Sequence, residues 1–185
     1  DPNLPEGVWA THLDEITIID NTDAQNPKKR GFRFQYGRYG GDPRLRLDRL
    51  YEVWYINEID VVEKHHYIFS YKPGSLPSKT SKKRDFFGYF NNSQDPSYEL
   101  TLVPCIVNIV YPWNGFFYPR CRDMSVNSSA VDVGILSEIQ YPTGGRTVLE
   151  FEPNQEADKY MGGLRIESIT QMDSTHTANK KIYDY

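Results

Sequence analysis

Hydrophobic and polar residues alternate with a period of two along most of the chain. In residues 32–36, for example, Phe32, Phe34 and Tyr36 alternate with Arg33 and Gln35. This alternation predicts a strand with one buried and one solvated face. The same pattern, or a short apolar run, predicts further strands at residues 51–61, 67–71, 86–90, 100–111, 116–118, 133–141, 147–152 and 164–172.

Helical spacing is nearly absent. The two best helical candidates are residues 42–49, opened by Asp42-Pro43, and residues 154–160, and each would form only a turn or two. Glycine pairs such as Gly144-Gly145 separate the apolar runs, as turn residues do. The sequence therefore predicts an all-β protein.

The length of 185 residues predicts a single β domain over residues 1–185, with flexible ends near residues 1–6 and 173–185. Hydrophobic residues make up 38% of the chain, which is enough for a core. Because an antiparallel sheet must close or cover its edges, we expect a single antiparallel β-barrel. The alternative is a two-sheet β-sandwich or jelly roll.

Charge and hydropathy exclude some classes of function. The chain has 21 basic and 25 acidic residues, a net charge of -4, so nucleic-acid binding is not indicated. No apolar stretch approaches the ~18 residues of a membrane span. Residues 28–49 hold eight basic and two acidic residues, which suits solvated strand faces or an anion-contacting surface.

Cysteine and sequon positions suggest a secreted or processed product. Cys105 and Cys121 flank a Pro-Trp-Asn-Gly turn, so we expect either a disulfide between two strands or two buried thiols. Glycosylation sequons begin at Asn91 and Asn127. The sequence begins at Asp1 without a methionine, which is consistent with processing.

No catalytic or metal-binding pattern stands out. His65 and His66 are adjacent on a predicted strand and would point to opposite faces, so they cannot chelate one metal together. Glu150 and Glu152 share a strand face, as in a carboxylate pair or, more commonly, a solvent-facing stripe. We therefore expect no catalytic residue, no metal and no cofactor.

The chain is rich in tyrosine, with 14 residues, and several aromatic side chains fall in predicted strands. In a sandwich they would fill the core, whereas in a barrel some would line a ligand cavity. We predict Trp54, Tyr55, Tyr67 and Phe69 as lining residues. Arg33 would contact an anionic group of the ligand, because guanidinium suits bidentate contacts.

One local motif resembles a known family. Gly7-Val8-Trp9 resembles the G-x-W motif that opens the first strand of lipocalins and related calycins. The resemblance implies an antiparallel barrel in which Trp9 closes one end and stacks on Arg165. It also implies that the protein carries a small hydrophobic molecule.

The predicted function is thus a non-catalytic binding protein that carries a small, largely apolar or amphipathic ligand in a β-barrel cavity. Two alternatives fit the same pattern. One is a structural jelly-roll subunit of a coat or capsid type, which would form an oligomer. The other is a secreted β-sandwich that binds carbohydrate or protein through exposed tyrosine and tryptophan.

Overall fold

The computed structural model describes residues 12–22, 28–39, 44–55, 61–93, 124–173 and 176–185. Within these residues the regular structure is entirely β, and no helix is present. The eight strands are β1 (Glu15–Asp20), β2 (Lys28–Arg38), β3 (Leu45–Tyr55), β4 (Val61–Tyr71), β5 (Leu136–Gln140), β6 (Arg146–Glu156), β7 (Lys159–Asp173) and β8 (His176–Ile182). The predicted all-β class is confirmed.

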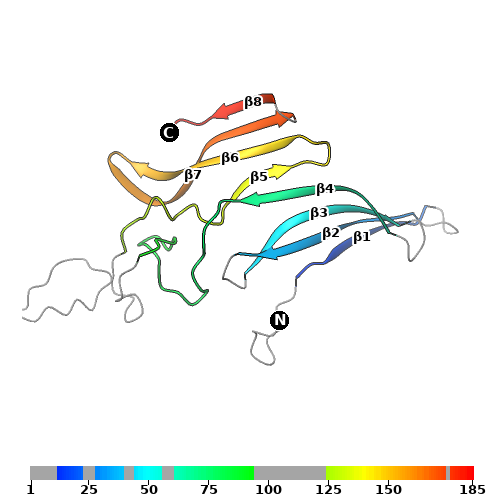
Figure 1. The fold of residues 1–185 in the computed structure, drawn as a ribbon, viewed down its shortest axis with the longest axis horizontal. Coiled ribbons are helices and arrows are strands. Elements are labelled where there is room, and N and C mark those ends of the chain that lie inside the picture. Colours follow the sequence, from blue (N-terminus) through cyan, green and yellow to red (C-terminus); the bar gives the residue numbers. More distant parts are fainter. Residues whose placement is uncertain (1–11, 23–27, 40–43, 56–60, 94–123, 174–175) are drawn as a thin grey trace, which may run out of the picture.

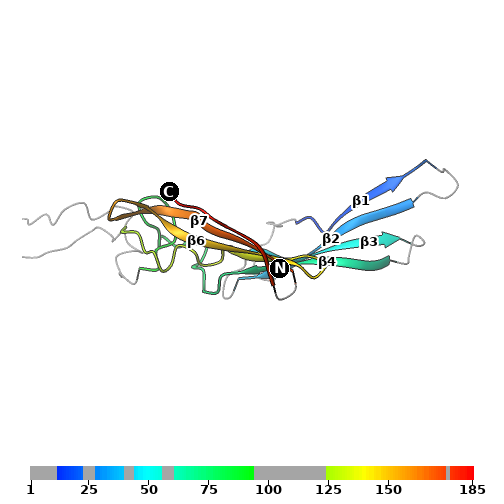
Figure 2. The same cartoon turned by 90° about the horizontal axis from the view of Figure 1, so that it is seen from above.

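The strands form one antiparallel sheet whose spatial order is the same as their order along the chain (Figure 1). Every strand therefore pairs with its neighbours in sequence, and β1 and β8 are the two edges. Figure 2 shows the strands as a single curved layer. The connection between β4 and β5, over residues 72–135, is the longest between the described strands, and we call it the long excursion.

The described strands do not close into the barrel that we favoured. In the part of the chain that the structure describes, β1 pairs with β2, β8 pairs with β7, and no pairing joins β1 to β8. The choice between a barrel and a sandwich stays a prediction, because the described residues show neither the closure of a barrel nor the second sheet of a sandwich.

Both expected helices are wrong. Residues 45–49 begin strand β3, where the spacing of Leu45, Leu47 and Leu50 is accommodated by a bulge at Asp48. Residues 154–160 form the tight hairpin between β6 and β7, in which Ala157 has a φ of 49°. Strand pairing outweighs the weak local helix preference of both segments.

Two strands lie where none was expected. Strand β1 pairs in regular register with β2, from Glu15 opposite Arg33 to Asp20 opposite Lys28. Strand β8 lies within residues 173–185, the polar segment expected to be a flexible end, and pairs with β7. The predicted strands at residues 100–111 and 116–118 lie outside the described residues.

The aromatic run at residues 86–90 is a tight loop rather than a strand. Its only ladder contact is an isolated bridge between Arg84 and Phe90. Asp85, which is 1% exposed, fixes the loop because its Oδ1 accepts hydrogen bonds from the backbone N–H groups of Phe87 and Tyr89, at 2.8 and 2.9 Å. We call residues 85–90 the aromatic loop.

Gly31 allows β1 to approach β2 closely. A Cβ atom at this position would lie 2.3 Å from the carbonyl oxygen of Ile16, which belongs to the opposing backbone. We expect Gly31→Val to push β1 away from β2 and to lower the free energy of unfolding by about 1–3 kcal/mol. Hydrogen exchange of the β1 amides and urea unfolding measure the two effects.

The matched control is Lys28→Ala, an exposed position at the start of the same strand. We expect it to leave the exchange rates of β1 unchanged. Equal exchange in Gly31→Val and the parent protein would contradict the steric role given to Gly31.

Candidate functional site

The pairing register assigns each side chain to one of two sheet faces, because opposed residues share a face and neighbours alternate. Phe34 lies opposite Leu50, which lies opposite Tyr67, and these three begin a row of apolar side chains. The row continues across the sheet through Phe69 opposite Ile139, and Leu149 opposite Ile169. We call this side of the sheet the apolar face.

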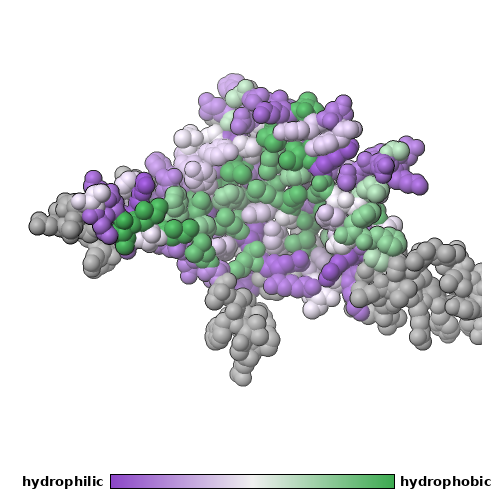
Figure 3. Space-filling view, turned by 180° about the vertical axis from the view of Figure 1, so that it is seen from behind, coloured by the Kyte–Doolittle hydropathy of each residue, from purple (hydrophilic) through white to green (hydrophobic). Residues whose placement is uncertain are grey.

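The apolar face extends over most of the strands. Its other apolar members include Ile16, Phe32, Trp54 and Phe151, which the register places on the same side. Figure 3 shows hydrophobic side chains gathered over the middle of the sheet, with hydrophilic residues along the margins. The apolar face is therefore an extended surface that spans most of the described sheet.

The side chains of the apolar face are only partly removed from water. Phe34, Leu50, Tyr67, Phe69 and Ile139 are all half-buried. Trp54 and Ile16 remain 41% and 43% exposed. Among the described residues, the buried hydrophobic side chains are those of Ala130 and of Val53, and the register places Val53 on the other face of the sheet. The sheet has an apolar face but not a closed core.

The structure divides the predicted ligand-binding residues between the two faces. Trp54, Tyr67 and Phe69 lie on the apolar face. Tyr55 and Arg33 lie on the opposite face. There the Lys29 Nζ lies over the Tyr55 ring, 4.2 Å from its centre. The five residues therefore do not line one site.

The opposite face, which we call the polar face, is lined by ion pairs between neighbouring strands. Arg33 Nε lies 3.3 Å from Glu15 Oε2, and Arg165 Nε lies 2.6 Å from Glu152 Oε1. Each pair joins residues that the register places directly opposite. These ion pairs favour the observed register of the strands. They also pair Arg33 and Arg165 with carboxylates of the chain itself, where an anionic ligand would otherwise bind.

The contacts of Arg165 do not test the role expected from the lipocalin resemblance. Arg165 pairs with Glu152 and lies 4.6 Å from the centre of the Tyr185 ring. Its expected partner, Trp9, lies outside the described residues. The same is true of Cys105 and Cys121, so the disulfide also stays a prediction.

Glu150 and Glu152 are both engaged in cross-strand contacts. Glu150 Oε2 accepts a hydrogen bond of 2.5 Å from the hydroxyl of Ser168 and lies 3.4 Å from Lys180 Nζ. The Ser168 hydrogen bond, followed by the charge of Lys180, lowers the pKa of Glu150. A carboxylate held ionised in this way suits a structural ion pair better than proton transfer.

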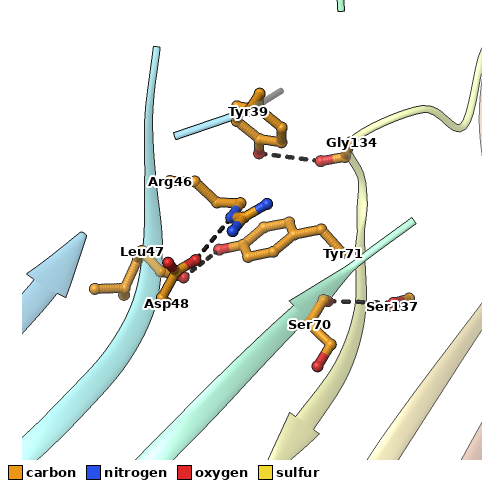
Figure 4. Close-up of polar contacts among 8 residues, drawn as sticks. All are labelled: Tyr39, Arg46, Leu47, Asp48, Ser70, Tyr71, Gly134 and Ser137. Carbon is orange, nitrogen blue, oxygen red and sulfur yellow. Dashed lines mark hydrogen bonds and ion pairs between the residues drawn. The ribbon is translucent and has the colours of Figure 1, made fainter. Parts of the chain in front are cut away.

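An arginine clamp fixes the return of the chain from the long excursion (Figure 4). The Arg46 guanidinium lies between the rings of Tyr39 and Tyr71, 5.6 and 5.5 Å from their centres, and its Nε donates to Asp48 at 2.7 Å. The Tyr39 hydroxyl donates to the carbonyl of Gly134 at 3.1 Å. The clamp thus ties β2 and β3 to the segment that enters β5.

The electrostatics of this clamp match its geometry. The hydrogen bond to Asp48 raises the pKa of Arg46, so the guanidinium stays charged. Burial, followed by the neighbouring Tyr39, raises the pKa of Tyr71, whose hydroxyl donates to the carbonyl of Leu47 at 2.8 Å. Arg46 therefore serves the packing of the fold rather than an open anion site.

Two open grooves lie beside these residues. One, of about 500 Å³, is lined by His12, Arg33, Tyr36 and their neighbours. The other, of about 450 Å³, lies over Arg46, Arg49 and Ser70. Both are lined mainly by charged and polar side chains, which does not favour a small apolar ligand.

A third groove, of about 290 Å³, has a different lining. Asn91, Ser125, Asn127, Ser128 and Tyr160 contribute to it, and none of its lining residues is charged. Asn91 is 2% exposed and its Nδ2 donates to the carbonyl of Ser125 at 3.3 Å, so a glycan attached to this sequon would displace that contact. We call this site the amide groove.

The described residues contain no cluster of three or more histidine, cysteine, aspartate or glutamate side chains placed to hold a metal ion. They also include no helix of the length and apolarity needed to cross a membrane. No protein-family model, curated protein or solved structure matches the chain.

The apolar face could have been predicted from the alternation of hydrophobic and polar residues in the sequence. The predicted hydrophobic contact residues were aromatic, so the aliphatic residues of this face were missed. Leu50, Ile139, Leu149 and Ile169 were not selected as contact residues, although each occupies an inward position of an alternating strand. Counting positions along each strand would have found them. Their joining into one surface depends on the register, which only the fold provides.

The interaction of Glu150 with Ser168 predicts a pH effect. The pKa of Glu150 is lower in the folded protein than in the unfolded chain, so its contribution to stability is present above the unfolded value. It is lost as the pH falls through the folded value. We expect Ser168→Ala to raise the pKa of Glu150 towards its ordinary value, as measured by NMR titration of the side-chain carboxyl.

The same linkage is tested by unfolding. Between about pH 5 and pH 3, the parent protein should lose more stability than Glu150→Gln, whose side chain does not titrate. Urea unfolding at both pH values gives the comparison. An identical loss in the two proteins would show that Glu150 does not contribute to acid sensitivity.

Proposed function

We propose that the chain is a non-catalytic structural module that assembles through its apolar face, with a second copy of the same chain as the occupant. The observation behind the proposal is a broad apolar face whose central hydrophobic side chains are only half-buried. A sheet with such a face is stable when another layer covers it. Two sheets packed face to face, about 10 Å apart, form a β-sandwich.

The size of the apolar face suits a dimer. It spans β2 to β7, which are mostly eleven residues long or longer. At about 4.8 Å between strands and about 3.3 Å per residue, this gives a surface of roughly 1,000 Å². A specific interface buries about 800 Å² on each partner, so the face is large enough for stable association.

The distribution of charge favours a second copy over a charged partner. The row from Phe34 through Leu50 to Tyr67 contains no charged residue. Charges of both signs occur near one end of the face, where Arg30 and Glu52 lie on neighbouring strands. Because the face carries charges of both signs, a contact between two identical faces does not bring together an excess of one sign.

This proposal belongs to the structural and sandwich-forming alternatives of the sequence analysis rather than to the small-ligand carrier. An open apolar face of this size exceeds what a small ligand covers, whereas a second sheet matches it. The ion pairs of the polar face give that side enough polar character to remain in water.

The decisive measurement is analytical ultracentrifugation of the purified chain from micromolar to millimolar concentration. We expect a dimer, and we expect Phe34→Glu to weaken it by about a hundredfold, because the substitution places a charge in the apolar row of the proposed interface. The matched control is Gln35→Glu, which places the same charge on the polar face one residue away. It should leave the dimer intact.

Folding must be checked separately, because Phe34→Glu also acts on the isolated sheet. Far-UV circular dichroism and hydrogen exchange of β6 and β7 report whether the variant keeps its strands. A cysteine introduced on the apolar face by Leu50→Cys should allow two copies to be joined by a bifunctional thiol reagent that spans about 10 Å, the separation of packed sheets, with the parent chain and its Cys105 and Cys121 as the background. A monomer at all concentrations, without crosslinking, would overturn the proposal and indicate that another part of the chain covers the face.

A further inference from the structure

We infer that the amide groove and the adjoining aromatic loop form a binding site for a neutral oligosaccharide. This inference is independent of the proposed dimer, because it rests on different residues at the far end of the β6–β7 hairpin. The site combines exposed aromatic rings with a small uncharged groove. That combination suits a ligand that offers both C–H faces and hydroxyl groups.

The aromatic rings are exposed although the backbone that bears them is fixed. Phe86, Phe87 and Tyr89 are 58%, 52% and 46% exposed. Asp85 accepts two hydrogen bonds from the loop backbone, and Phe86 N–H donates to the carbonyl of Met124 at 3.0 Å. A loop backbone that is fixed before binding loses little conformational entropy when a ligand stacks on its rings.

Two glycines of β7 seat the aromatic loop. A Cβ atom at Gly162 would collide with the Phe87 side chain, and one at Gly163 would lie 2.9 Å from Tyr89. Tyr160, itself 52% exposed, precedes these glycines on the same strand and lines the amide groove. The loop and the groove therefore meet at the start of β7.

Hydrogen bonds of the Asn127 side-chain amide connect the segments that line the groove. Asn127 Nδ2 donates to the carbonyl of Asn91 at 2.8 Å, and the Asn127 Oδ1 accepts from the Ser129 N–H at 3.0 Å. Ser128 and Tyr160, whose side chains carry hydroxyl groups, also line the groove. Amides and hydroxyls both donate and accept hydrogen bonds, as the hydroxyls of a sugar do.

The volume and charge of the groove restrict the ligand further. About 290 Å³ corresponds to roughly ten water molecules, which accommodates a sugar ring with its hydroxyl groups. The absence of charged residues from its lining gives no basis for selecting an acidic or basic ligand. The neighbouring rings of Phe87 and Tyr89 would then contact a further ring of the same oligosaccharide.

The test uses saturation-transfer NMR and calorimetry with the full chain. The probes are cellohexaose, maltohexaose and mannohexaose, with hexagalacturonate as an acidic comparison. We expect at least one neutral probe to bind with a Kd of about 0.1–1 mM. We expect Tyr160→Ala and Phe87→Ala each to weaken that binding about tenfold, whereas Tyr160→Phe retains the ring and most of the affinity.

The control variant is Tyr183→Ala, an exposed tyrosine that follows β8 and does not line the groove. Its affinity for the probe should equal that of the parent chain. Asp85 is a positioning residue, so Asp85→Ala should weaken binding while Asp85→Asn, which keeps a side-chain oxygen acceptor, should restore much of it. Thermal unfolding confirms that each variant is folded.

Two outcomes would overturn the inference. If no neutral probe binds at about 10 mM, the site is not a sugar site, and the exposed rings become candidates for contact with a protein. If a probe binds but Tyr160→Ala and Phe87→Ala leave its affinity unchanged, the sugar binds elsewhere. Because ultracentrifugation measures the dimer separately, failure here is distinguishable from failure of the proposed assembly.

Discussion

The structure depends on one constraint: an antiparallel sheet with an apolar side must hide that side from water. Here the strands pair in their order along the chain, so the backbone hydrogen bonds are satisfied between neighbours without a second layer. Hydrophobic burial is not satisfied in the same way, because neighbouring side chains on one face shield each other only partly. The central residues of the apolar face are accordingly half-buried. The same sheet that completes the hydrogen bonding leaves the hydrophobic requirement unmet within the described residues.

The two faces of the sheet contribute to the register of the strands in different ways. On the polar face, directly opposed residues of unlike charge, such as Arg33 with Glu15 and Arg165 with Glu152, favour the observed register. Half-exposed pairs of this kind contribute little to stability individually. Their value lies in specificity, because a shift of one residue would separate the charges and turn the apolar side chains towards water. The ion pairs on the polar face and the hydrophobic side chains on the apolar face thus favour the same register.

Much of the fold can be predicted from the alternation of the sequence, and the strands that this pattern misses are missed for physical reasons. Strands β2 to β7 each overlap a predicted strand, because alternation marks both their faces. The predicted strand at residues 51–61 is wrong in its bounds, since it covers only the second half of β3 and reaches the first residue of β4. Strand β8 was not predicted, because an edge strand with Lys180 and Lys181 needs few apolar residues to pair on one side. In β1 the adjacent Ile18 and Ile19 interrupt the alternation. Local pattern identifies strands that are half-buried, and it misses strands held mainly by backbone pairing.

The candidate sites were less accessible to sequence reasoning than the strands. Trp54 and Tyr55 were chosen together because both are aromatic, yet adjacent strand residues must point to opposite faces. The amide groove was missed for another reason. It joins Asn91 to Asn127 and Tyr160 across long separations, and each residue looks ordinary in its own segment.

The position of the amide groove also follows from the meander. Each hairpin in such a sheet ends at one of its two margins, so a segment that departs from the sheet can fold back only over a margin or a face. The excursion after β4 returns to the sheet through the arginine clamp, and its aromatic loop rests on Gly162 and Gly163 near the β6–β7 hairpin. A loop seated on glycines at a margin presents its rings outward without occupying the centre of the apolar face. The fold thereby separates a surface suited to assembly from a site suited to a ligand, and the two can act without competing for the same residues.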